Sequence, residues 1–274
     1  MTSDPYPPPV GKLLTYGDCR NFRQWPDYLA LGLGPEHVPD LIRMATDPDL
    51  NWADSESLEV WAPVHAWRAL GQLRAEAAIE PLLALFHELE DSDWAPELSE
   101  VFGLIGPTAI PALMAYLTDP QHGLYPRAYA ADSLGEIAKH HPEARAASLA
   151  ALIHEFERFA DNEPELNGFI LAALLDLNAV EAAPLIERAF AAGRVDVFIA
   201  GDWEEVQIEF GLKAERSTPR HRWPWAEEFD RLLRGAQPGP SADEISQRLL
   251  AWQPPAAEAG AATHKRKRRR RRKG

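Results

Sequence analysis

A pattern of glycine, proline and aliphatic residues recurs along the chain, and this internal repeat constrains the fold more than any other feature. Gly34–Pro48 (GPEHVPDLIRMATDP) aligns without a gap on Gly106–Pro120 (GPTAIPALMAYLTDP). A second register places VWAPVHAWRALGQL over LYPRAYAADSLGEI, so that Gly71 meets Gly135, and Gly103 lies 32 residues from each of them. Self-similarity at a fixed period of about 20–50 residues is the signature of stacked repeat architectures.

Each copy is predicted to form two helices. In the first helix, Ala66, Leu70 and Leu73 have the i, i+4, i+7 spacing of one helical face. A Leu-Gly turn is expected to end this helix, and the second begins near a proline or an acidic residue. The apolar stripe of the second helix consists of Ile79, Leu82, Leu83 and Phe86. Because such a pair cannot bury its apolar face alone, the copies are expected to stack into an all-α, right-handed α-α superhelix, or solenoid.

The repeats resemble a known family. Their Ala-rich first helix, Leu-Gly turn and Ala-x-x-x-Leu-(Leu/Ile) spacing in the second helix are similar to short HEAT-like repeats of the phycobilisome-lyase type, over Trp25 to Phe190. This resemblance implies a solenoid of helical hairpins and a function among bilin lyases, enzyme maturation factors and scaffolds. The chain also resembles small bacterial HEAT-like proteins, some of which end in a cysteine-rich zinc motif. No cysteine occurs in the tail here, so no zinc site carries over.

The composition divides the chain into four segments. Residues 1–24 are predicted to form a Pro-rich N-terminal arm, and residues 25–192 contain the HEAT-like repeats. Residues 193–252 are expected to form a helical C-terminal cap, with helices near Trp203–Phe210, Glu227–Leu233 and Ala242–Trp252. Residues 253–274 are Pro/Ala/Gly-rich and then basic, which predicts a disordered linker and a polybasic tail.

Charge is distributed very unevenly between the tail and the rest of the chain. The formal net charge is -14, yet the tail carries nine consecutive cations, Lys265 to Lys273. The remaining 19 Lys and Arg stand against 42 acidic residues, so the rest of the chain carries 19 - 42 = -23. A block of like charges at a terminus is typically a disordered interaction arm. The tail is expected either to reach outward to phosphate groups or to fold back onto the acidic body.

Cysteine usage and hydropathy favour a soluble, cytoplasmic protein with no membrane partner. Cys19 is the single cysteine, which excludes an internal disulfide framework and fits a reducing compartment. The N-terminal stretch lacks the charged start and apolar run of a signal peptide. No stretch approaches the roughly 20 apolar residues that a membrane-spanning helix needs.

Catalytic and metal-binding motifs are not found. His140 and His141 are adjacent, so they cannot ligate one ion in the i, i+4 manner, and His154-Glu155 lacks the second histidine of a zinc-protease helix. Arg20 lies beside Cys19 and would lower the pKa of its thiol, but no histidine or asparagine marks the thiol as a nucleophile. The sequence therefore predicts no catalytic residue, no metal and no cofactor.

Tryptophans and carboxylates gather in the first two full repeats. Large aromatics at repeated positions mostly pack between repeats, but a solenoid surface can also display them as anchors for a partner. In the second interpretation Asp54, Glu56, Glu59 and Glu100 add further acidic charge beside the anchors. The predicted partner-binding residues are Trp52, Trp61, Trp67, Trp94, Asp91, Asp93 and Glu97.

One segment of the body is both basic and aromatic. Arginine beside tryptophan can stack on bases and contact phosphate. In the other interpretation, cations of this segment such as Lys213 pair with neighbouring acids such as Glu204, Glu205 and Glu209. The predicted nucleic-acid-binding residues are Arg216, Arg220, Arg222, Trp223, Trp225, Lys265, Arg266, Lys267, Arg268, Arg269, Arg270, Arg271, Arg272 and Lys273.

Three functions follow from these features. The first is a non-enzymatic scaffold whose acidic, Trp-bearing surface binds a protein or peptide, a basic one in view of the charge of the body. The second is association with nucleic acid through the polybasic tail and the Arg/Trp segment. The third, implied by the family resemblance, is a lyase-like or maturation factor that acts on a cofactor-bearing protein. The sequence leaves the identity of the partner and the oligomeric state open.

Overall fold

The fold is all-helical. The computed structural model describes residues 6–90, 94 and 96–219, and within these residues every regular element is an α-helix or a 3₁₀-helix, without a β-strand. The prediction of an all-α fold is confirmed. The α-helices are α1 (Val38–Ala45), α2 (Pro48–Asn51), α3 (Ala62–Gln72), α4 (Ile79–Glu88), α5 (Glu97–Ile105), α6 (Ile110–Thr118), α7 (Leu124–His140), α8 (Arg145–Phe156), α9 (Pro164–Asp176), α10 (Ala183–Ala191), α11 (Val197–Ala200) and α12 (Trp203–Glu209).

A short 3₁₀-helix recurs before the second helix of each predicted copy. It leads directly into α1, α4, α6, α8 and α10, and each time it is three residues long. Proline at the start of these segments costs little, because the first amides of a helix have no intrahelical partner. The recurring 3₁₀-helices are Pro35–His37, Glu76–Ala78, Pro107–Ala109, Pro142–Ala144 and Val180–Ala182. The two-helix unit that the sequence predicts is therefore present in the structure.

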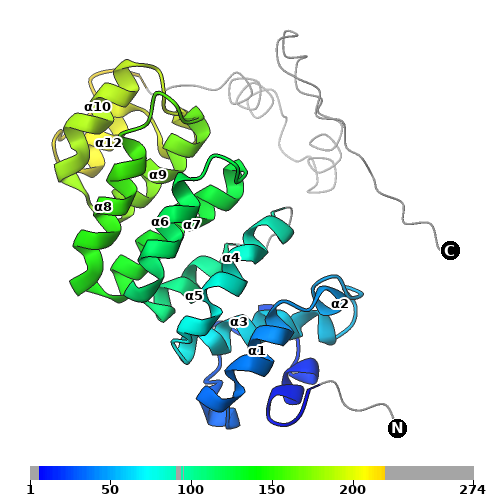
Figure 1. Ribbon diagram of the computed structural model, residues 1–274. Coiled ribbons are helices and arrows are strands. Elements are labelled where there is room, and N and C mark those ends of the chain that lie inside the picture. The colour runs from blue at the N-terminus through cyan, green and yellow to red at the C-terminus, as the bar shows by residue number, and fades with distance from the viewer. Residues whose placement is uncertain (1–5, 91–93, 95, 220–274) are drawn as a thin grey trace, which may run out of the picture. The chain divides into compact units, whose positions relative to one another are not determined.

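Helices that are two elements apart in the chain lie side by side. The helices α1, α3, α5, α7, α9 and α11 contact one another in that order, and α4, α6 and α8 form a second series of contacts (Figure 1). Most of the buried apolar side chains of these helices belong to one continuous hydrophobic core. No single helix of the described residues is long and apolar enough to cross a membrane; α5 and residues 107–118, which meet at 109°, reach the required length and composition only together.

The repeated glycines lie inside helices rather than in turns, which corrects the expectation of a Leu-Gly turn. Gly71, Gly103 and Gly135 belong to α3, α5 and α7. A Cβ atom on Gly103 would lie 2.9 Å from the Cβ atom of Glu136 on α7. Glycine at this position therefore allows two neighbouring helices to approach closely.

Gly103→Ala is expected to lower the free energy of unfolding by about 1–2 kcal/mol, because the added methyl overpacks the α5–α7 contact by more than the gain in helix propensity. The matched control is Gly135→Ala, where the nearest atom, the Cβ of Ala173, is 3.8 Å from the new methyl. This control is expected to be neutral or to stabilise by up to about 1 kcal/mol. Urea unfolding of both variants tests the pair, and equal losses in both would contradict the packing role of Gly103.

The N-terminal segment is packed against the helices, which differs from the expected Pro-rich arm. Tyr6, Val10, Leu13 and Cys19 are fully buried, and the Tyr6 hydroxyl donates to the Asp47 carboxylate at 2.8 Å. The segment forms two 3₁₀-helices, Val10–Thr15 and Cys19–Asn21. Short 3₁₀-helices have no apolar periodicity that spans several turns, so the sequence pattern did not reveal them. Residues 1–5 lie outside the described residues.

The last described helix agrees with its prediction to within one residue. The sequence predicts Trp203–Phe210, and α12 covers Trp203–Glu209. Asp202 caps it, accepting from the Glu205 amide at 3.0 Å while the Glu205 carboxylate accepts from the Asp202 amide, which is the reciprocal capping box. The further helices predicted at 227–233 and 242–252, and the linker and tail at 253–274, lie outside the described residues.

Candidate functional site: a tryptophan-lined cavity

Three of the four tryptophans predicted to bind a partner line one cavity. The cavity has a volume of about 310 Å³ and includes Trp61, Trp67 and Trp94. It opens where the segment after α2 meets the start of α3 and the residues that follow α4. Its other lining residues are Arg20, Asn51, Ser55, Glu56, Val60, Val64 and Leu89. Ligand pockets of this kind combine aromatic walls with a few polar groups that fix the orientation of the ligand.

The indoles of Trp67 and Trp61 are both buried, and each is held by a contact with a neighbouring side chain or helix. Trp67 is 1% exposed, and its Nε1–H donates to the Ala45 carbonyl on α1 at 3.1 Å, which fixes the ring. Trp61 is 8% exposed and meets Trp94 edge to face, with ring centroids 5.1 Å apart and an interplanar angle of 81°. Trp67 therefore serves the core as well as the cavity, as the packing interpretation of the tryptophans expected.

Charged side chains lie at the rim of the cavity. The Arg20 guanidinium lies over the Trp61 ring, with Cζ 4.7 Å from the ring centroid. Asp18 holds the same guanidinium at 2.6 Å (Oδ2 to Nη2) and 3.0 Å (Oδ1 to Nε). Glu56 is an exposed carboxylate among the lining residues. The sequence indicates Glu56 as one of the acids near the tryptophans but does not indicate Arg20, because no local pattern connects Arg20 to a tryptophan 41 residues away.

Trp52 and Glu97, the other partner-binding residues that the structure describes, are not among the residues that line the cavity. Trp52 is 64% exposed and follows Asn51, a lining residue. Glu97 faces Arg68, whose Nε donates to it at 2.7 Å, and Trp25 stacks on that guanidinium at 5.1 Å. Burial raises the pKa of Glu97, although Arg68 acts to lower it. Glu97 is thus a bridge between α5 and α3. Asp91 and Asp93 lie outside the described residues.

A second cluster that the sequence did not reveal joins α5 to α7. Glu100, Glu136 and His140 place ligand-type atoms within 4.8 Å of one another. The His140 Nε2 atom lies 2.8 Å from Glu100, and Lys139 donates to Glu136 at 2.8 Å and to Asp176 on α9 at 2.9 Å. The i, i+4 spacing of Glu136 and His140 is the one feature of the sequence that indicates that these two side chains lie on the same face of a helix. Because Lys139 already neutralises Glu136, the cluster acts as an ion-pair bridge across three helices.

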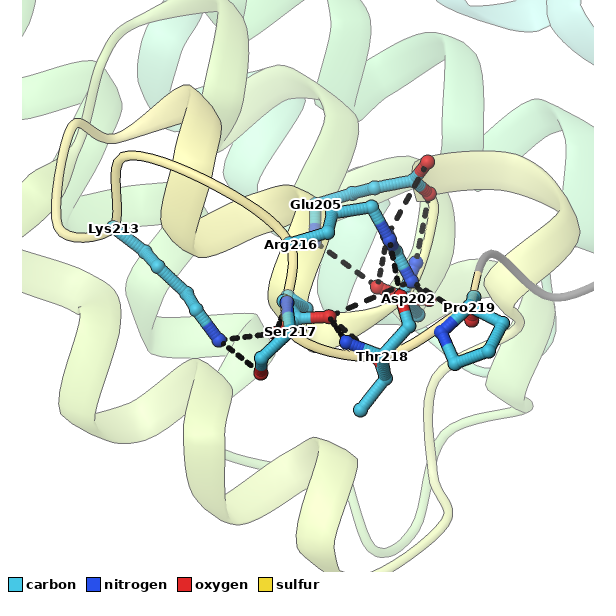
Figure 2. Close-up of polar contacts among 8 residues, drawn as sticks. Asp202, Glu205, Lys213, Arg216, Ser217, Thr218 and Pro219 are labelled. Atoms are coloured by element: carbon cyan, nitrogen blue, oxygen red, sulfur yellow. Dashed lines mark hydrogen bonds and ion pairs between the residues drawn. The ribbon is translucent and has the colours of Figure 1, made fainter.

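Lys213 and Arg216, the described cations of the Arg/Trp segment, are paired with carboxylates (Figure 2). Arg216 donates to both oxygens of Asp202, at 3.0 and 2.6 Å, and Lys213 donates to Glu204. Glu204 also accepts from the backbone and hydroxyl groups of Ser217 and Thr218.

The Lys213 bond is the main cause of a lowered pKa for Glu204, and the Arg216 bond lowers the pKa of Asp202. This pairing is the arrangement that the alternative interpretation of the segment expected for Lys213 and Glu204. Arg220, Arg222, Trp223, Trp225 and the cations of the tail lie outside the described residues.

The thiol of Cys19 is in a different environment from the one that its arginine neighbours suggested. Burial raises the pKa of Cys19 to about 12, which outweighs the lowering by Arg68. Nearby, His65 is held on both ring nitrogens, Nδ1 at 2.7 Å from the Tyr28 hydroxyl and Nε2 at 2.9 Å from the Gly17 carbonyl. Burial lowers the pKa of His65, so the neutral imidazole accepts from Tyr28 and donates to Gly17. Both groups stabilise the packing of the N-terminal segment on α3.

Comparisons with known proteins give no information on function, so the function is inferred from the residues and their arrangement. No family model matches the chain, and no curated protein or solved structure matches it.

Proposed function

We propose that this chain is a non-enzymatic, HEAT-like helical-repeat scaffold that binds a polypeptide partner by taking one of its side chains into the tryptophan-lined cavity. The observation that carries this proposal is the meeting of Trp61, Trp67 and Trp94 in one cavity with an exposed carboxylate, Glu56. Aromatic side chains in a desolvated pocket supply most of the binding energy at protein interfaces. The volume of about 310 Å³ is large enough to take in one large side chain of a partner.

The repeat architecture supports the same function. Helix pairs stacked in series present a long surface along which an extended partner can lie. The two-helix unit, with a 3₁₀-helix before its second helix, recurs from α3 to α10. From this regular recurrence we propose that the helices form a right-handed solenoid. A charge of -23 outside the tail favours a basic partner, since opposite charges steer association and suppress partners of the same sign.

Selection from a random peptide library displayed on phage, with the full chain as bait, tests the proposal without knowledge of the natural partner. Enriched peptides are expected to lose at least about tenfold in affinity, which is 1.4 kcal/mol, on a variant with a filled cavity. Ser55→Trp is such a variant, because Ser55 lines the cavity and is exposed. Fluorescence polarisation with labelled copies of the peptides measures the loss.

The matched control is Thr108→Trp, which adds the same side chain at an exposed position in another helix pair, on the 3₁₀-helix before α6. Its affinities should equal those of the unaltered chain, and circular dichroism should show that both variants are folded. Enriched peptides that bind Ser55→Trp and the unaltered chain equally well would refute the cavity as the binding site. A selection that enriches no peptide would refute the scaffold function itself.

A further inference from the structure

The chain itself shows which chemistry the cavity accepts. A guanidinium group, that of Arg20, lies over the Trp61 ring at 4.7 Å, a distance at which the negative face of the indole attracts a cation. Trp94 meets Trp61 edge to face, so the ring under the guanidinium is held in place. The face of Trp61 is thus shown to take a planar cation.

Arg20 has the features of a displaceable occupant. Its side chain is 63% exposed, and it lies on the three-residue 3₁₀-helix Cys19–Asn21. The Asp18 carboxylate, two residues earlier, grips the guanidinium with both oxygens and would keep it near the rim after it left the ring. Exposed ion pairs and exposed cation–π contacts are weak, so a competing side chain with additional partners can replace Arg20 on Trp61.

The polar lining residues supply those additional partners. Glu56 is the acid of the cavity, and its field already acts on Arg20. Asn51 and Ser55 line the same cavity, and their side-chain oxygens can accept hydrogen bonds from N–H donors. A guanidinium satisfies such a set best, because it stacks its plane on an indole and directs five N–H donors outward; a lysine ammonium is a point charge that is more strongly hydrated.

We infer that the cavity recognises an arginine side chain of the partner, which replaces the guanidinium of Arg20 on Trp61 and pairs with Glu56. This inference rests on the proposed function and specifies the residue that enters the cavity. Arg20 then acts as an internal competitor that the partner must displace. The polybasic tail contains six arginines and is a second internal source of the same group.

Labelled octa-arginine and octa-lysine test the inference, because the two peptides have equal charge and differ in the cationic group. The readout is the ratio of their dissociation constants at one salt concentration, measured by fluorescence polarisation. With the full chain, octa-arginine is expected to bind at least fivefold tighter. The same ratio is measured with a chain that lacks residues 265–273, where both affinities should rise and the ratio should be at least as high, because the arginines of the tail no longer compete for the cavity.

Four variants test whether the preference for arginine arises in the cavity. Ser55→Trp and Trp61→Leu should reduce the ratio to about one, and Ser55→Trp keeps the test valid if Trp61→Leu fails to fold. Arg20→Ala should raise the ratio several-fold, since the internal competitor is gone. Arg23→Ala removes the same charge three residues further along, at another exposed position, and should leave the ratio unchanged.

A ratio that survives Ser55→Trp, or that does not rise in Arg20→Ala, would overturn the inference. Its failure can be told apart from that of the proposed function. If the peptide library yields cavity-dependent peptides without arginine, the scaffold function stands and the arginine preference is wrong. If no peptide depends on the cavity, both are wrong.

Discussion

Replacing Arg127 by alanine is expected to lower the free energy of unfolding by about 3 kcal/mol, the lower end of the cost of breaking a buried ion pair, because the buried carboxylate keeps one other partner. Arg127 is 3% exposed, and its Nη2 atom lies 2.7 Å from the fully buried carboxylate of Glu155 on α8. Its Nε–H donates to the Leu117 carbonyl at the end of α6 at 2.8 Å. The variant therefore leaves a buried carboxylate with Arg158 as its remaining ion-pair partner and a carbonyl oxygen without this donor.

Thermal and urea unfolding followed by circular dichroism measure the effect, with Arg145→Ala as the matched control. Arg145 pairs with Glu181 at 3.1 Å and donates to the Leu177 carbonyl at 2.9 Å, but more than a third of each of the two charged side chains is exposed, so its loss should cost only about 1 kcal/mol. The double variant Arg127→Met, Glu155→Met should recover most of the loss, because it leaves no buried charge. An Arg127→Ala variant as stable as Arg145→Ala would show that the buried pair contributes little.

Any binding of the full chain to duplex DNA is expected to require Lys265–Lys273 and to be lost when these residues are deleted. Nine cations that each neutralise one phosphate predict a slope of about -8 in a plot of log affinity against log salt concentration, with no sequence preference. Such a slope corresponds to a loss of about 10⁵-fold between 50 and 200 mM salt. Fluorescence polarisation with a labelled duplex, over that range of salt, measures both quantities.

The structure provides the control for the tail. Because Lys213 and Arg216 are already paired with Glu204 and Asp202, the variant Lys213→Ala, Arg216→Ala should bind DNA with the slope of the full chain. If DNA binding persists after deletion of the tail, the binding site lies in another part of the chain. A tail that folds back onto the acidic body would weaken the affinity at low salt and make the slope shallower than -8.

The repeats could be predicted from the sequence because their signal is local and periodic. Gly34–Pro48 and Gly106–Pro120 both become a 3₁₀-helix followed by an α-helix, as their common pattern indicates. The same pattern led to the wrong prediction that the repeated glycines lie in turns. A single sequence does not distinguish a glycine that forms a turn from a glycine in a helix that is packed closely against its neighbour. Distinguishing the two requires the position of Glu136 on the next helix.

The cavity could be predicted in part. The recurrence of Trp61 and Trp94 at the starts of successive copies indicated a shared position, and the two rings are in contact. The contribution of Arg20 could not be predicted, because the N-terminal segment reaches α3 through contacts between residues about 40 positions apart, such as Tyr28 with His65. Apolar periodicity reports the face of one helix and gives no information on which distant segment covers that face.

The packing of the N-terminal segment on α3 has a consequence for the order of events during synthesis. Tyr28 and Pro26 have their hydrogen-bond partners at His65 and Gln72, so they cannot dock until those residues have been made. At roughly 5–20 residues per second, the interval is a few seconds on the ribosome. During that time Cys19 lacks the burial that raises the pKa of its thiol in the folded protein. The N-terminal segment can therefore pack and bury Cys19 only after the residues of α3 have been synthesised.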